Sequence, residues 1–69
     1  MDIKYDKETD SLSIVLLDNP IDDSDEIRPG VIADFDKDGS LVSIEILNAS
    51  KKVRRLNEIG YNQKVLQVA

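Results

Sequence analysis

Residues 31–47 of this 69-residue chain read VIADFDKDGSLVSIEIL. Apolar and polar residues alternate on both sides of the pair Asp38-Gly39, and such alternation is typical of strands with one buried face. An Asp-Gly pair between two such runs is a strong hairpin signal, because both residues tolerate the positive φ angles of a type I′ turn. The stretch therefore predicts an Asp-Gly hairpin over 31–47.

The two-residue turn also predicts which residues lie opposite one another. The apolar pairs all fall on one face: Phe35 with Val42, Ala33 with Ile44 and Val31 with Ile46. The opposite face would carry the remaining pairs: Asp36 with Leu41, Asp34 with Ser43 and Ile32 with Glu45. A sheet with one solvated face requires this sorting.

The same letters allow a second interpretation. Residues 34–45 match the acidic calcium-loop pattern D-x-[DN]-x-[DN]-G-x5-E at every fixed position. The metal ligands would be Asp34, Asp36, Asp38 and Glu45. However, a helix should enter such a loop, whereas Pro29-Gly30 and the β-branched residues after them disfavour one. The hairpin is the favoured interpretation, and divalent-metal binding by the acidic turn is the alternative.

The rest of the chain extends this fold. Residues 1–17 alternate around a polar loop at 7–10 and predict a first hairpin, with Tyr5 opposite Leu12 and Ile3 opposite Ile14. Residues 18–30 read as an acidic connection and the start of the third strand. Cap residues and helical spacing predict a short helix over 50–60, and residues 63–68 suit a further strand. The predicted fold is α+β: an antiparallel β-meander of two hairpins, about four strands, with a short C-terminal helix and a fifth strand that would complete this sheet or a neighbour's.

Composition limits the chemistry. The chain contains neither cysteine nor histidine, which removes thiolate and imidazole zinc sites and the usual nucleophile systems. We therefore expect no enzyme, no catalytic residues and no cofactor. Residues 1–69 suit one small domain with a thin core, so self-association into a homo-oligomer is expected. With no long apolar run and no signal peptide, the expected location is the cytoplasm, without membrane insertion.

Charge is unevenly distributed. Residues 1–47 carry thirteen acids and four bases, whereas residues 48–69 carry one acid and five bases. The leading hypothesis is a non-enzymatic interaction module whose acidic face binds a basic protein partner, since complementary potentials steer association. The candidate partner-binding residues are Asp22, Asp23, Asp25, Glu26, Asp34 and Asp36, with Asp38 beside them; acids kept only for solubility are the competing interpretation.

A different hypothesis uses the basic segment. Four positive charges, Lys51, Lys52, Arg54 and Arg55, lie within five residues, and phosphate contacts need such a cluster. The acidic net charge of −5 works against a phosphate backbone, and a solvated helix face explains the same residues. Nucleic-acid binding is therefore the alternative function, and nucleic acid is not an expected partner.

Three ordered motifs resemble those of a known family. They are Tyr5-Asp6-x-Glu8-x-Asp10-x-Leu12-x-Ile14, then Pro29-Gly30-Val31-Ile32-x-Asp34-x-Asp36-x-Asp38-Gly39, then Glu45-Ile46-Leu47-Asn48-Ala49-Ser50. Over residues 1 to about 52 the chain resembles the small prokaryotic family called domain of unknown function 2283, from which it departs at Ser13, commonly an aromatic position. The resemblance implies a fold in which the acidic turn belongs to a hairpin, and a prokaryotic cytoplasmic setting. It carries no established activity, although some members are suspected to be antitoxin-like partners of small toxins.

Overall fold

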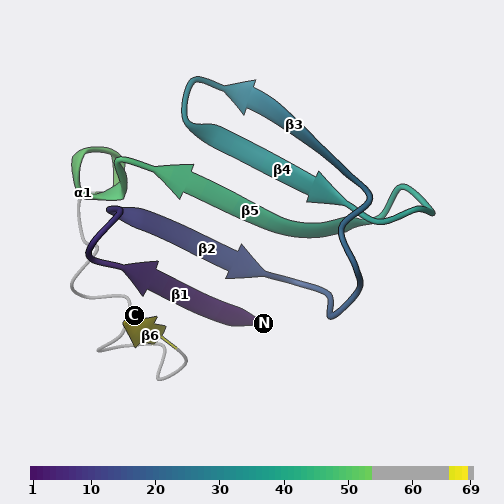
Figure 1. Cartoon of the computed structure of the whole chain (residues 1–69), viewed down its shortest axis with the longest axis horizontal. Helices are drawn as coiled ribbons and strands as arrows, with labels where there is room; N and C mark the ends of the chain where they lie inside the picture. The colour runs from purple at the N-terminus through teal and green to yellow at the C-terminus, as the bar shows by residue number, and fades with distance from the viewer. Residues whose placement is uncertain (54–65, 69) are drawn as a thin grey trace.

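One mixed sheet forms the body of the protein (Figure 1). The computed structural model describes residues 1–53 and 66–68. Its elements are β1 Asp2–Asp6, β2 Ser11–Val15, β3 Asp23–Arg28, β4 Val31–Phe35, β5 Leu41–Leu47, the helix α1 Ala49–Lys52 and β6 Leu66–Val68. In the described residues the strand order is β3-β4-β5-β2-β1-β6. Strands β1 to β5 are antiparallel to their neighbours, and β6 is parallel to β1.

The two predicted hairpins are confirmed, but their arrangement is not that of a simple meander. The first hairpin, β1–β2, meets the second through β2 and β5, with Leu12 opposite Ile46 and Ile14 opposite Ile44. Tyr5 opposite Leu12 and Ile3 opposite Ile14 are confirmed in the first hairpin. These pairings continue the apolar face from one hairpin into the other, which is why β2 and β5 come together rather than β2 and β3.

In the second hairpin, four of the predicted pairs are correct, from Val31 opposite Ile46 to Asp34 opposite Ser43. The register then shifts, and Phe35 lies opposite Leu41 instead of Val42. The two-residue type I′ turn is therefore wrong.

A wider turn replaces it. Ser40 accepts a hydrogen bond from the Asp36 backbone N–H, and Gly39 donates to the Asp36 carbonyl. In the described chain, positive φ among non-glycine residues occurs at Asp10 and Asn48, hence not at Asp38, whereas Gly39 has φ 84°. A three-residue loop with glycine in the left-handed region has these features. A bulge at Val42, between the pairs Phe35–Leu41 and Asp34–Ser43, joins this loop to the predicted register of the remaining pairs.

The acidic run is an edge strand rather than a connection, so the predicted strand count was one too low. Asp23–Arg28 forms β3, which pairs with β4 from Asp23 opposite Phe35 to Arg28 opposite Val31, with a bulge between Glu26 and Arg28. Pro29-Gly30 is the turn between β3 and β4. Acidic residues have low strand propensity, but an exposed edge strand tolerates charge on both faces.

The helix predicted for residues 50–60 begins close to its expected first residue, directly after β5. Helix α1 covers Ala49–Lys52, and Val53 is already extended, at φ −108° and ψ 103°; the remainder of the helix predicted for 50–60 lies outside the described residues. Strand β6 covers Leu66–Val68 and pairs with β1 of its own chain, whereas residues 63–65 lie outside the described part. No helix in the described part is both long and apolar enough to span a membrane.

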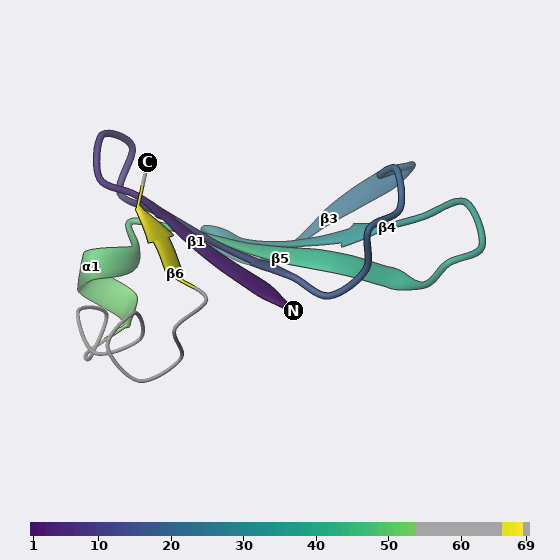
Figure 2. The same ribbon diagram turned by 90° about the horizontal axis from the view of Figure 1, so that it is seen from below.

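The core lies where α1 packs against one face of the sheet. Ile3, Leu12 and Ala49 are buried together, with Tyr5, Ile46 and Val53 packed against them. Figure 2 shows α1 on one side of the sheet, close to β1 and away from β3. The core thus holds the β1–β2 end of the sheet, and β3 lies at the far edge.

Candidate functional site

The acidic edge, defined as Asp22, Asp23, Asp25 and Glu26, lies on and just before β3. All six residues of β3 are exposed, and Asp22 is exposed as well. Because side chains alternate along a strand, Asp23 and Asp25 project from the face that carries Phe35 and Ala33, and Glu26 projects from the other. The structure therefore brings together four of the six predicted partner-binding residues in one accessible strip.

The other two predicted partner-binding residues are not on the surface. Asp34 is 1% exposed and Asp36 is 8% exposed. The Asp34 carboxylate lies between two strands and accepts hydrogen bonds of 2.6 Å from the hydroxyls of both Ser24 and Ser43. The pairing of Asp34 with Ser43 is confirmed, but the expected exposure of Asp34 on a solvated face is wrong. Its second partner, Ser24, could not be anticipated because the segment of Ser24 read as a loop. Asp34 joins β3, β4 and β5 rather than facing a partner.

Glu45 is coupled to this buried carboxylate. Burial would raise the pKa of Asp34, but hydrogen bonds from Ser24, Ser43 and Glu45 outweigh it, and the pKa is lowered. The pKa of Glu45 is raised, first by its hydrogen bond to Asp34, then by burial and by repulsion from the Asp34 charge. The stability that Glu45 contributes is therefore present below its ordinary pKa of 4.5 and is lost as pH rises through its raised folded value.

Replacing Asp34 should release this coupling. In Asp34→Asn we expect the pKa of Glu45 to fall toward its ordinary value of 4.5, because its hydrogen bond to the Asp34 carboxylate is lost together with the neighbouring charge. The measurement is an NMR titration of the Glu45 side-chain carboxyl. Asp38→Asn serves as the control and should leave Glu45 raised; an unchanged Glu45 midpoint in Asp34→Asn would show that the two groups are not coupled.

The carboxylate of Asp36, in the turn after β4, is also held by hydrogen bonds within the protein. Its Oδ1 accepts the backbone N–H groups of Asp38 and Ser40, both at 2.9 Å, and its Oδ2 accepts the Asn19 amide at 3.0 Å. The Ser40 N–H and the Asn19 amide are the main reasons that the pKa of Asp36 is lowered. Asp36 closes the turn and ties it to the loop after β2, as a turn-forming aspartate commonly does.

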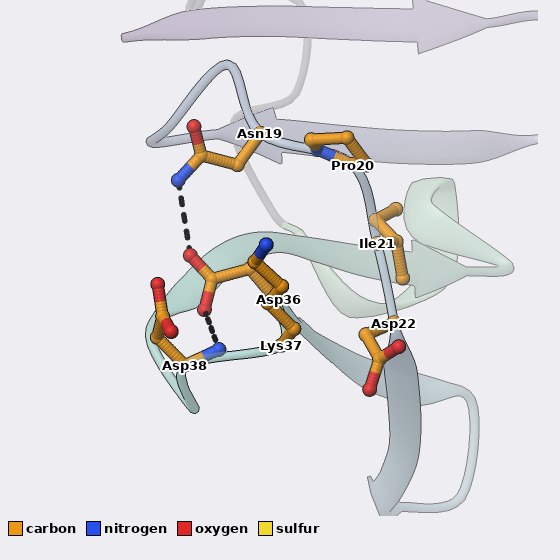
Figure 3. A pocket seen from close by; sticks show the side chains of 7 residues that line it. All are labelled: Asn19, Pro20, Ile21, Asp22, Asp36, Lys37 and Asp38. Atoms are coloured by element: carbon orange, nitrogen blue, oxygen red, sulfur yellow. Dashed lines mark hydrogen bonds between the residues drawn. The ribbon is translucent and has the colours of Figure 1, made fainter.

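A shallow hollow of about 340 Å³ lies beside this turn, between residues 19–22 and 36–38. Figure 3 shows the Asp36 carboxylate between Asn19 and the Asp38 backbone, with Asp22 on the opposite side of the hollow. Among the described residues, no three acidic side chains come close enough together to hold a metal ion. Of the four ligands of the calcium-loop alternative, Asp34 and Asp36 accept hydrogen bonds within the protein, Glu45 lies beside Asp34, and Asp38 is exposed.

Asp10 is the residue that sequence reasoning missed. Its carboxylate accepts the Tyr5 hydroxyl at 2.6 Å, the Ser50 backbone N–H at 3.0 Å and the Ser50 hydroxyl at 2.7 Å. Its carbonyl accepts the Ala49 N–H at 2.9 Å. Asn48, which occupies the N-cap position, makes no side-chain cap bond. Asp10 thus caps α1 from a turn forty positions earlier, and no local sequence signal could reveal that.

The basic segment is only partly described. Lys51 and Lys52 lie in α1 and are exposed, whereas Arg54 and Arg55 lie outside the described residues. The Lys52 ammonium donates to the backbone carbonyls of Leu47 at 2.8 Å and Pro29 at 3.2 Å. Lys52 therefore links α1 to the β3–β4 turn, which leaves Lys51 as the described cation facing solvent from the helix.

A single-layer sheet with a one-turn helix at one end and an acidic strand at its edge defines a small α+β domain. The sequence belongs to the family described as "Protein of unknown function (DUF2283)", which matches residues 2–50. No curated protein and no solved structure matches the chain. The family match covers β1 to the start of α1. The acidic edge, the Asp34 carboxylate with Ser24 and Ser43, and the Asp10 cap all lie inside it.

Proposed function

We propose that this protein is a non-enzymatic interaction module that binds a basic segment of another protein through the acidic edge. The supporting observation is that β3 is exposed along its whole length while four acids lie within residues 22–26. Clustered like charges raise the on-rate of an oppositely charged partner and disfavour partners of the same sign. Masking of a basic protein surface, as an antitoxin does, would use such an edge.

The position of the acids supports this function over nucleic-acid binding. The acids gather on β3 at the edge of the described sheet, and Lys52 of α1 reaches the carbonyl of Pro29 just beyond the end of that strand. The net charge of −5 repels a phosphate backbone. Of the cations on α1, Lys52 already donates hydrogen bonds to two backbone carbonyls. Affinity for phosphates grows with the number of cations that contact them, so the described part of the basic segment supports little binding.

We also propose that the chain self-associates. Several large apolar side chains are strongly exposed, among them Met1, Ile21 and Ile27 at 68%, 53% and 55%. A chain of this length buries a smaller fraction of its surface than a larger domain does, and a second copy would cover part of the exposed apolar area. Light scattering at micromolar concentration should then give a mass above the 7.7 kDa of one chain, and the mass of one chain would contradict self-association.

A charge reversal tests the partner-binding proposal. The double variant Asp23→Lys with Asp25→Lys should bind a labelled peptide of alternating lysine and threonine about tenfold more weakly than the wild type does, because attraction becomes repulsion. Fluorescence anisotropy at low and high salt measures this, and salt should weaken the wild-type complex.

The matched control changes the net charge by the same amount elsewhere. Asp2→Lys with Glu8→Lys alters two exposed acids on and after β1, across the sheet from β3. The control should retain wild-type affinity to within about threefold, a difference of less than 1 kcal/mol. Equal losses in the two double variants would show that only net charge matters and would contradict a site on β3.

A further inference from the structure

In the described part of the chain, the outer edge of β3 carries backbone groups with no strand partner, in addition to its charges. Among residues 1–53 and 66–68, β3 is the terminal strand of the sheet and pairs with β4 on one side. In an antiparallel pair, successive residues direct their N–H and C=O groups alternately toward the neighbouring strand and away from it. Alternate residues of Asp23–Arg28 therefore present backbone donors and acceptors outward, where another strand can pair with them.

From this geometry we infer that the basic partner binds by strand addition: an extended segment pairs with the outer edge of β3 and places basic side chains opposite Asp23 and Asp25. This inference rests on the proposed function and specifies its mode. Backbone hydrogen bonds supply the affinity in such complexes, and alternate side chains supply the specificity.

The usable window on β3 is short and well defined. At one end, the Asp22 N–H is already bonded to the Phe35 carbonyl at 2.8 Å. At the other end, a bulge interrupts the register between Glu26 and Arg28, and Pro29 has no N–H to offer. A partner strand therefore pairs along residues 23–26.

Within this window, the acids differ in availability. The Glu26 carboxylate accepts the Gly30 N–H at 3.0 Å, and the Ser24 hydroxyl donates to Asp34. In the described part of the structure, no such bond holds the carboxylates of Asp23 and Asp25, which lie two residues apart on one face. The matching partner has two basic residues separated by one, since cross-strand pairs of opposite charge are favourable.

The same charges disfavour a second copy of β3 as the occupant. Two β3 strands paired edge to edge would place acids opposite or diagonal to acids, and like charges directly opposite destabilise a strand pair. Acidic edges discourage pairing between copies of one chain for this reason. A basic strand from another protein avoids the repulsion and replaces it with attraction.

Amide hydrogen exchange tests the inference in the full chain. The probe is the peptide of alternating lysine and threonine, and the readout is the exchange rate of each backbone amide by NMR. Strand addition predicts that alternate amides within residues 23–26 exchange at least about tenfold more slowly in the complex, because outward N–H groups gain partners. Amides of β1 serve as the internal control and should not change.

A second peptide separates backbone pairing from charge. The same sequence with every backbone nitrogen methylated keeps its charges but cannot donate backbone hydrogen bonds, and it should bind at least about tenfold more weakly. Equal affinity of the two peptides, with no slowing of exchange in residues 23–26, would overturn strand addition while leaving charge-based binding intact. Failure of both peptides to bind would overturn the proposed function itself.

Discussion

Leu12→Ala is expected to remove most of the stability of the fold. Leu12 is 1% exposed and contacts the buried cluster with Ile3 and Ala49, where α1 meets the sheet. Truncating a buried leucine to alanine typically costs about 2–5 kcal/mol. A domain of this length is stable by only about 3–10 kcal/mol in total. Urea unfolding followed by far-UV circular dichroism should therefore give a much lower midpoint, or a chain already unfolded in buffer.

Leu16→Ala is the matched control, since it removes the same atoms one residue beyond β2. Leu16 is 41% exposed, and substitution of an exposed side chain usually changes stability by less than about 0.5 kcal/mol. If the two leucine variants were to unfold at similar urea concentrations, the core would not lie beneath α1.

The second large effect is expected at Asp10, which joins the first hairpin to α1 through Tyr5 and Ser50. Asp10 has a positive φ of 54°, so alanine would add backbone strain to the loss of contacts. Asp10→Gly avoids this strain because glycine accepts positive φ. We expect Asp10→Gly to lower the thermal midpoint by about 5 °C or more, since a helix cap and a charge-assisted hydrogen bond are lost together.

The pH dependence of this effect has a definite sign. The Tyr5 hydroxyl and then Ser50 lower the pKa of Asp10 below its ordinary value of 3.8. A lowered folded pKa contributes stability above the unfolded pKa, and this stability is lost as pH falls through the folded value. The difference in thermal midpoint between the wild type and Asp10→Gly should therefore be full at neutral pH and shrink below pH 3.8.

Two further variants separate the Asp10 contacts from general loss of an acid. Asp18→Gly removes an exposed aspartate in the loop after β2 and should have a small effect by comparison. Tyr5→Phe removes only the hydroxyl, and in Asp10→Gly this change should cost much less than in the wild type, because the acceptor is already missing. Fully additive losses would contradict a direct interaction between Tyr5 and Asp10.

The parts of the fold that depend on residues close together in sequence, the two hairpins, were predicted from the sequence. Alternation around Lys7–Asp10 and around Asp38-Gly39 located both hairpins, and it gave the pairing of Asp34 with Ser43. The turn geometry was wrong because a bulge permits a three-residue loop that the same letters allow. Strand β3 was missed because its acids disfavour a strand in isolation, whereas pairing with β4 at an exposed edge overrides that preference.

The candidate site was likewise predicted only in part from the sequence. The acidic edge is visible in the sequence as a run of acids, and the structure keeps it exposed. Asp34 and Asp36 look equivalent to those acids in sequence, yet they are buried and hydrogen-bonded. Pattern reasoning cannot separate the two groups without knowing that Ser24 lies across from Asp34, and the cap from Asp10 to Ser50 depends on contacts between distant segments.

The most direct test of the acidic edge as a partner surface is affinity capture from an extract of cells that naturally produce the protein, with three baits compared side by side. The baits are the wild type, Asp23→Lys with Asp25→Lys, and Asp2→Lys with Glu8→Lys. We predict a stoichiometric basic protein that is retained by the wild type and the control, released by high salt and absent from the β3 variant. Retention of the same protein by the β3 variant, or a wild-type partner that is not basic, would contradict the proposal.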